Sequence, residues 1–280
     1  MTTRIGMPKN LIFVRHGQSE GNVVNKRSRK GDHSVFTEEF MATSSAYYRL
    51  NEKGVEQAQS AGYWLRDNFA GTFNRLYASE YTRAVETAHY LNLPEAEGLV
   101  EWFLDMRLRE RDYGTMDALP MNERIRLFQD ELKRREINPF LWAPPGGESI
   151  ANVCERADRL LGTLERECSE KNVLVVAHGE FITAAMVRLE RMSQEKFRGI
   201  YTSEHPWDHF HNGQILQYTR VHPEDPDGPL SPHFMWRRTI CPWNLSLSKS
   251  HGAWELIHRP TYTNEDLRRL FESRTRFVQE

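Results

Sequence analysis

The sequence has few cysteines, little net charge and no long apolar run, and each shortage removes a class of protein. Its three cysteines, Cys154, Cys168 and Cys241, lack C-x-x-C spacing, which argues against a zinc site or disulfide framework and predicts reduced thiols. With 37 basic and 39 acidic residues the net charge is −2, so no overall basic field favours nucleic-acid binding. No apolar stretch reaches the roughly 18 residues of a membrane-spanning helix. We therefore expect neither nucleic acid nor membrane as a partner.

The N-terminal residues and the overall composition predict a cytoplasmic globular protein. Residues 1–8 contain no apolar segment of the kind found in a secretory signal peptide. Hydrophobic residues at 39% and charged residues at 27% are ordinary for a globular chain, and no linker divides the sequence. We expect one domain over residues 1–280, with a regular core at about 10–220 and a less regular extension at about 221–280.

Short apolar runs alternate with helical patterns along the chain. Continuous apolar residues predict buried strands near 11–14, 75–79 and 172–177, because a strand covered on both faces needs no alternation. Further strands are predicted at 215–221 and 254–257. Apolar spacing and capping residues predict helices at 52–68, 80–88, 120–136, 181–189, from Ser149 to about 168, and from Thr263 onward. This order predicts a three-layer α/β/α sandwich with a mostly parallel central sheet, helices on both faces, and loop insertions.

Two of the predicted strands end in a histidine followed by a glycine. Arg15, His16 and Gly17 follow the first strand, and His178 and Gly179 follow the strand at 172–177. Ligands of open α/β sheets collect at the carboxyl ends of the strands, so this edge is a candidate anion site. A histidine at a strand end is otherwise most often a structural residue, and one such motif alone would not identify a function.

Four motifs in a fixed order carry more information than any one of them. They are VRHGQSEGN at 14–22, ASEYTRAVET at 78–87, LRERDYG at 108–114 and VVAHGE at 175–180. Together they resemble the histidine phosphatase superfamily, also called the phosphoglycerate-mutase-like family. The resemblance covers residues 10–190 and fits the chain beyond about 200 only loosely.

The resemblance implies a role for each matching residue. His16 would be the nucleophile that becomes transiently phosphorylated, and Glu110 would protonate the leaving group, with Asp112 as the alternative acid. The other matching residues would bind the phosphoryl group: the side chains of Arg15, Asn22, Arg83 and His178, and the backbone amide of Gly179. We expect no metal and no cofactor, because the arginines already supply the positive charge.

The motifs therefore predict a metal-independent phosphatase acting on a soluble small phosphate ester, such as a sugar phosphate. One alternative is a phosphoglycerate mutase, although mutases of this family continue as Tyr-Gly-x-x-x-Gly-Leu-Asn-Lys, whereas here Tyr113 and Gly114 precede TMDALP at 115–120. A second alternative is a weakly catalytic module that binds a phosphorylated ligand. The polar segment 26–48 has no helical or strand period, and is either a lid over the site or a solvated loop.

Overall fold

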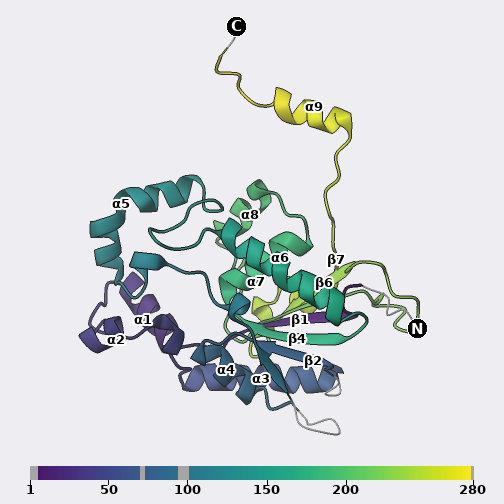
Figure 1. Ribbon diagram of the computed structural model, residues 1–280, viewed down its shortest axis with the longest axis horizontal. Helices are drawn as coiled ribbons and strands as arrows, with labels where there is room; N and C mark the ends of the chain where they lie inside the picture. Colours follow the sequence, from purple (N-terminus) through teal and green to yellow (C-terminus); the bar gives the residue numbers. More distant parts are fainter. Residues whose placement is uncertain (1–5, 70–72, 94–100, 279–280) are drawn as a thin grey trace.

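The computed structural model describes residues 6–69, 73–93 and 101–278 (Figure 1). Part of the segment in which no signal peptide is expected, residues 1–5, lies outside these ranges, as do residues 70–72, 94–100 and 279–280. All three cysteines are described, and each is free and buried.

The described strands form one sheet in the order β3-β2-β4-β1-β5-β6-β7. Their bounds are β1 Asn10–Arg15, β2 Arg75–Ala78, β3 Trp102–Leu104, β4 Asn172–Ala177, β5 Ile215–Thr219, β6 Trp236–Ile240 and β7 Glu255–Leu256. The pairs from β3 to β1 are parallel, whereas β5, β6 and β7 add antiparallel strands at one edge. The core of the sheet is thus mostly parallel, as predicted. In the register of β1 with β4, Arg15 faces Ala177, so the two histidines that follow leave the sheet side by side.

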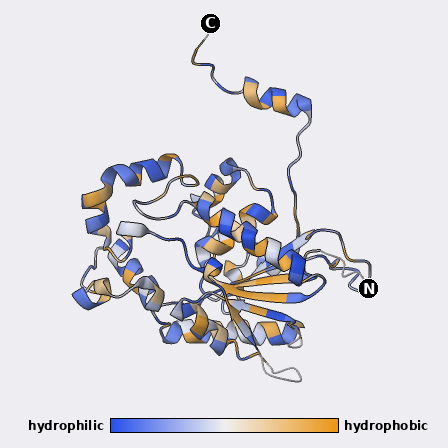
Figure 2. Ribbon diagram, viewed as in Figure 1, coloured by the Kyte–Doolittle hydropathy of each residue, from blue (hydrophilic) through white to orange (hydrophobic). Residues whose placement is uncertain are grey.

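Helices cover both faces of the sheet (Figure 1). The helices α3 (Glu52–Phe69) and α4 (Thr82–Tyr90) pack against Ile12 and Val14 of β1. Leu11 and Phe13 point to the opposite face, which is covered by α6 (Ile150–Glu167) and α7 (Gly179–Leu189). Figure 2 shows the resulting apolar centre of the molecule. Both faces of β1 are buried, which is why its sequence is continuously apolar, and the three-layer prediction is confirmed.

The remaining helices of the described residues are α1 (Glu20–Arg29), α2 (Glu38–Ala42), α5 (Met121–Ile137), α8 (Gln194–Tyr201) and α9 (Asn264–Glu272). Of these, α1, α2 and α8 were not predicted from the sequence. The prediction that 26–48 has no regular structure is wrong, because it holds the end of α1, all of α2 and the 3₁₀ turn Ser45–Tyr47. A capping box between Ser19 and Asn22 starts α1, and few of its residues are buried, so no apolar period marks it.

Strands β3 and β6, like helix α8, were also missed, and one helix is packed differently from its prediction. The expected apolar face of α5 is not buried: Ile125 is 53% exposed, and no residue of this helix is fully buried. Figure 1 shows α5 next to α1 and α2 at one end of the molecule. There it forms a wall rather than a layer of the core.

The packed core continues beyond residue 220. Strands β6 and β7 extend the sheet, and Phe234, Ile240 and Ile257 belong to its buried clusters. Helix α9 begins at the predicted capping residue Thr263, has no buried residue, and stands away from the layers in Figure 1. No helix in the described ranges is long and apolar enough to cross a membrane.

Candidate active site

The carboxyl ends of β1 and β4 open into a cavity of about 790 Å³. Its base is formed by Arg15, His16, Arg83, Glu110 and Gly179, which the sequence places far apart. Its outer walls come from α1, α5 and α8 and from residues 208–210. The structure therefore brings together the residues that the four motifs predicted.

His16 is held in a defined tautomer. Its side chain is buried, with 2% of the residue exposed, and Nδ1 lies 2.7 Å from the carbonyl oxygen of Gly17. Because a carbonyl only accepts hydrogen bonds, Nδ1 carries the proton and Nε2 keeps its lone pair. The Nε–H of Arg83 lies 3.3 Å from Nε2. Burial, together with the charges of Arg83 and Arg15, lowers the pKa of His16 well below its usual value, so the imidazole is neutral.

His178 faces His16 across the base, with ring centroids 5.0 Å apart. Its Nε2 lies 2.8 Å from Ser79 Oγ, whose oxygen also accepts from the Tyr81 N–H at 3.3 Å. The Ser79 hydroxyl hydrogen is thus available to His178 Nε2, which leaves the single proton of the neutral ring on Nδ1. Burial is the main cause that lowers the pKa of His178. Its Nδ1 is buried and has no hydrogen-bond partner among the described residues.

Arg15 also keeps a donor free. One terminal nitrogen of its guanidinium donates to the Phe210 carbonyl, whereas Nε is buried without a partner in the described ranges. An unsatisfied buried donor is costly, on the order of 1–3 kcal/mol, and is uncommon outside sites that receive a ligand. Arg15 lines the cavity base, and His178 adjoins it, since its ring centroid lies 5.0 Å from that of the cavity-lining His16. Arg15 Nε and His178 Nδ1 are suited to oxygen atoms of a bound anion.

Asn22 and Gly179 complete the predicted phosphate contacts. Asn22 Oδ1 accepts from the Ser19 N–H in the α1 capping box and from Asn212 Nδ2, at 3.1 and 3.0 Å, which leaves its own amide hydrogens for the cavity. Gly179 is the first residue of α7, and its backbone N–H lies at the positive end of that helix. Asn212 also donates to the His16 carbonyl at 3.0 Å and so holds two residues of the first motif; no motif in the sequence pointed to it.

Glu110 lies in the electrostatic surroundings of an acid. Burial, followed by the negative charge of Glu180, raises its pKa, although Arg15 and Arg83 act in the opposite direction. Its Oε1 accepts from the Arg111 N–H at 3.0 Å. The alternative acid, Asp112, is exposed and accepts from the Gly114 N–H at 2.7 Å, a turn contact. The environment thus separates the two carboxyl groups and favours Glu110.

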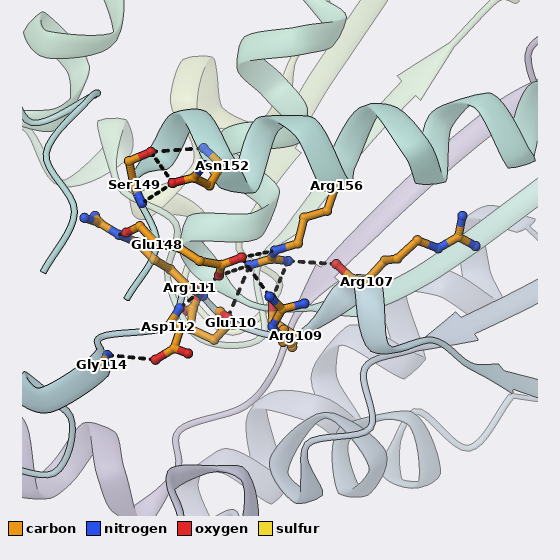
Figure 3. Close-up of polar contacts among 10 residues, drawn as sticks. All are labelled: Arg107, Arg109, Glu110, Arg111, Asp112, Gly114, Glu148, Ser149, Asn152 and Arg156. Atoms are coloured by element: carbon orange, nitrogen blue, oxygen red, sulfur yellow. Dashed lines mark hydrogen bonds and ion pairs between the residues drawn. The ribbon is translucent and has the colours of Figure 1, made fainter. Parts of the chain in front are cut away.

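A residue of α6, Arg156, holds the segment that carries Glu110 in place, as Figure 3 shows. Arg156 donates to the carbonyl oxygens of Arg107, Arg109 and Glu110 at 2.7, 2.8 and 3.2 Å. Its Nε also donates to Glu148 Oε1 at 2.9 Å. The sequence analysis missed Arg156, but a signal was present: it is a charged residue on the otherwise apolar face of the predicted helix, and it is 7% exposed.

No group of three or more histidine, cysteine, aspartate or glutamate side chains in the described part of the chain converges as metal ligands. The site's positive charge comes from guanidinium groups, of which Arg83 is buried. The donor set of the cavity base is therefore suited to an anion, and the geometry offers an imidazole nitrogen, several N–H donors and one acid around it.

Comparison with known proteins assigns this constellation to a family. The sequence profile of the histidine phosphatase superfamily (branch 1) matches residues 11–211. The chain belongs to the histidine phosphatase superfamily. It is 29% identical, over 195 residues, to the 2,3-bisphosphoglycerate-dependent phosphoglycerate mutase of Parvibaculum lavamentivorans, covering 68% of this chain and 84% of that protein. The family prediction, and with it the prediction of an enzyme of the histidine phosphatase type, is confirmed.

Two solved structures have the same fold. A mycobacterial glucosyl-3-phosphoglycerate phosphatase, solved with VO3, has a TM-score of 0.56 at 24% identity and covers 75% of this chain and 92% of its own. The α-ribazole phosphatase of Shigella flexneri has a TM-score of 0.56 at 18% identity and covers 80% and 96%. At these identities the likeness concerns the fold alone.

Proposed function

We propose that this protein is a metal-independent phosphomonoesterase that acts through a phosphohistidine on His16, with Glu110 as proton donor. The observation that carries the proposal is the base of the cavity. There a neutral His16 has an unprotonated Nε2 that accepts from Arg83 Nε at 3.3 Å, while buried donors of Arg15 and His178 have no partner in the described ranges. A soluble small phosphate ester fits the cavity volume of about 790 Å³. The buried free cysteines agree with the reducing cytoplasm as its location.

In the first step, His16 Nε2 attacks phosphorus and the bond from phosphorus to the ester oxygen breaks. The leaving oxygen takes the proton of Glu110, which becomes a carboxylate. The N–H groups of Arg15, Arg83, His178 and the Gly179 backbone offset the charge on the transferring oxygens. The raised pKa of Glu110 keeps its proton available for this step.

In the second step, water attacks the phosphohistidine and the P–N bond breaks. The Glu110 carboxylate accepts a proton from that water, which restores the acid, and orthophosphate is released. His16 regains its lone pair at Nε2, and the Gly17 carbonyl keeps the proton on Nδ1 throughout. The carboxyl group thus serves first as acid and then as base.

Phosphoglycerate mutase activity is the second candidate, favoured by the mutase names of the sequence relatives. Counting from Tyr113 and Gly114, the glycine of the mutase motif falls at Ala118 and the lysine at Met121. Ala118 has a φ of 51°, a left-handed conformation that glycine adopts readily. Met121 lines the cavity without the charge of a lysine. This loss of charge supports the phosphatase over the mutase.

A weakly catalytic module that binds a phosphorylated ligand is the third candidate. Such a module would need the donors of the cavity base but neither a free imidazole nitrogen nor an acid. The raised pKa of Glu110 beside a neutral His16 therefore supports turnover rather than binding alone.

The deciding experiment measures phosphate release and phosphoenzyme formation by the parent protein and by His16→Ala. We expect the parent to hydrolyse p-nitrophenyl phosphate at the same rate with or without chelator, and to yield an acid-labile, base-stable phosphoenzyme. His16→Ala should lose turnover by roughly three orders of magnitude or more, because it removes the nucleophile. Full activity of His16→Ala would refute the mechanism. Activity lost in chelator and restored by a divalent ion would refute metal independence, and conversion of 3-phosphoglycerate to its isomer would favour the mutase.

A further inference from the structure

A second group of cations lines the same cavity on the wall formed by α1 and α5. Lys26 and Arg29 come from α1, and Arg124 and Arg135 come from α5. None of these residues belongs to the four motifs, and no ion pair is formed by any of them within the described ranges. The wall therefore places positive charge around the cavity at a distance from the motif residues of the base.

Within this group, Arg124 combines burial with a guanidinium nitrogen that lacks a partner among the described residues. Its Nε is buried and has no hydrogen-bond partner in the part of the chain that the structure describes. Its Nη2 reaches Asn25 Oδ1 only at 3.5 Å, and the guanidinium carbon lies 5.9 Å from the centre of the Tyr113 ring. Burial is the main cause that lowers the pKa of Arg124; Tyr113 and Asp117 act in the opposite direction, and the charges of Arg29 and Arg135 lower it further. Like charges that line one cavity favour an anion between them.

The arginines on the outer sides of the same helices are paired. On α5, Arg126 contacts Glu123 at 2.6 Å and Arg134 contacts Glu131 at 3.0 Å. On α1, Arg27 contacts Asp32 at 2.6 Å. These outward-facing arginines thus each form an ion pair, whereas Arg29 and Arg124, which line the cavity, form none within the described residues, although Asp117 also lines it. A general excess of basic residues would not produce this division.

We propose that the wall of Lys26, Arg29 and Arg124 is a second anion-binding site, and that the substrate carries a second anionic group besides the phosphate that is cleaved. This inference rests on the proposed function and narrows its substrate class to small esters with two anionic groups. The second group is a phosphate or a carboxylate, since a guanidinium binds the oxygens of either one bidentately. Neutral sugar monophosphates would leave the wall unpaired.

The segment 26–48 takes part in this site through α1 rather than as a loose loop. The side chain of Phe40 stacks on Tyr48 with ring centroids 4.4 Å apart, and Phe36 packs against Phe40 at 5.5 Å. The Met121 N–H donates to Ser28 Oγ at 2.8 Å, which joins α1 to the start of α5. These contacts hold the two sources of cations in one wall before any ligand binds.

The test compares pairs of substrates that differ by one anionic group. Glycerol 3-phosphate is compared with 3-phosphoglycerate, which adds a carboxylate, and fructose 6-phosphate with fructose 1,6-bisphosphate, which adds a phosphate. We expect the parent to have a KM about tenfold lower for the two-anion member of at least one pair, as a charge-assisted hydrogen bond produces. The pair that shows this difference in KM identifies the second anionic group as a carboxylate or a phosphate and indicates its distance from the phosphate that is cleaved.

Variants on two helices locate the effect. Arg124→Gln and Arg29→Gln should each remove most of the KM difference within that pair, by about tenfold. The matched controls are Arg126→Gln on α5 and Arg27→Gln on α1, which should retain the parent's KM difference because these side chains are paired outside the cavity. Raised salt should also shrink the difference in the parent.

The proposal is overturned if neither pair shows a preference in the parent, or if Arg124→Gln and Arg29→Gln retain the parent's preference. Calorimetry, which measures how tightly each substrate binds the parent, distinguishes failure of this proposal from failure of the proposed function. If p-nitrophenyl phosphate is not hydrolysed, the phosphatase function fails. The two-anion member of one pair must then still bind about tenfold more tightly than its partner. Equal binding of both members in both pairs would overturn the second anion site independently of turnover.

Discussion

In the proposed mechanism, the pH dependence of turnover rests on Glu110. It must hold a proton when the ester bond breaks, and burial together with the charge of Glu180 raises its pKa for that purpose. Glu180 itself is held by Tyr113 and Arg111, whose hydroxyl and Nη1 donate to its Oε1 at 3.1 and 3.4 Å. The pKa of Glu110 is thus raised by a neighbouring carboxylate on α7.

We predict that Glu180→Gln moves the alkaline limb of kcat/KM for an alkyl phosphate to lower pH. Activity falls as pH rises through the pKa of Glu110, since the deprotonated form cannot protonate the leaving oxygen. Removing the charge of Glu180 lowers that pKa, by about one unit if the repulsion is worth ~1.4 kcal/mol. The pH profile of kcat/KM measures the shift. An unmoved limb would exclude Glu180 from this role.

A variant of Glu110 itself tests whether this residue, rather than Glu180, is the proton donor. Glu110→Gln should lose more activity with an alkyl phosphate than with p-nitrophenyl phosphate, because an activated leaving group needs little protonation. With the aryl substrate its loss should also be smaller than that of His16→Ala. Equal losses with both substrates would mean that Glu110 acts other than as proton donor.

Among the elements, α3 and the loop after β1 make the closest approach near the nucleophile. A Cβ on Gly54 would lie 2.1 Å from the Gln18 carbonyl oxygen, and one on Gly17 would lie 2.1 Å from the Gly54 carbonyl oxygen. Gln57 Oε1 accepts from the Gln18 N–H at 2.9 Å. The start of α3 therefore supports the loop that carries His16, and two glycines permit the contact.

We predict that Gly54→Ala displaces this loop. The free energy of unfolding should fall by about 1–3 kcal/mol, the usual cost of overpacking, and kcat should fall by about tenfold or more because His16 moves. Thermal unfolding and p-nitrophenyl phosphate turnover measure the two effects. The matched control is Gly162→Ala in α6, where the new Cβ meets only the Arg166 side chain at 3.4 Å. That variant should be neutral or stabilised by roughly 0.5–1 kcal/mol. Unchanged stability and turnover in Gly54→Ala would contradict the role of this contact.

For the whole molecule, we propose a single domain that includes the C-terminal strands. Strand β6 pairs with β5 along five residue pairs, and Ile240 lies in the cluster between the sheet and α3. Among the residues that the structure describes, Arg259 is the last that hydrogen-bonds to the domain: its Nε donates to the Leu189 carbonyl and its Nη2 to the Phe234 carbonyl, both at 2.8 Å. Beyond it, α9 is exposed along its length.

We predict opposite outcomes for two truncations. Deleting residues 261–280 should leave the melting temperature and turnover within error of the parent, because no residue of α9 is buried. Deleting residues 221–280 should prevent stable folding, because it removes β6 and uncovers apolar residues on both faces of the sheet. Circular dichroism melts and phosphate release measure both. A clear loss of stability on deleting 261–280 would mean that α9 packs on the domain in solution.

The sequence by itself determined the elements and residues whose information is local. Strands β1 and β4 are readable because burial on both faces makes every residue apolar, and α6 because its apolar residues recur at helical spacing above Ser149. The residues at the base of the cavity were also predicted, since the motifs that carry them lie in short contiguous segments. The capping box of α9 likewise marked the start of that helix.

The tertiary structure alone decided what depends on packing between distant segments. Strands β3 and β6 are short and only partly buried, and α1 buries few residues, so their sequences carry no strong period. Asn212 reaches His16 across 196 positions of the chain, and its role follows only from the contact. The cavity wall of Arg29 and Arg124 has the same origin. Whether an arginine on α1 or α5 lines the cavity or pairs with a carboxylate outside it depends on how the two helices pack against each other. No local sequence pattern indicates that packing.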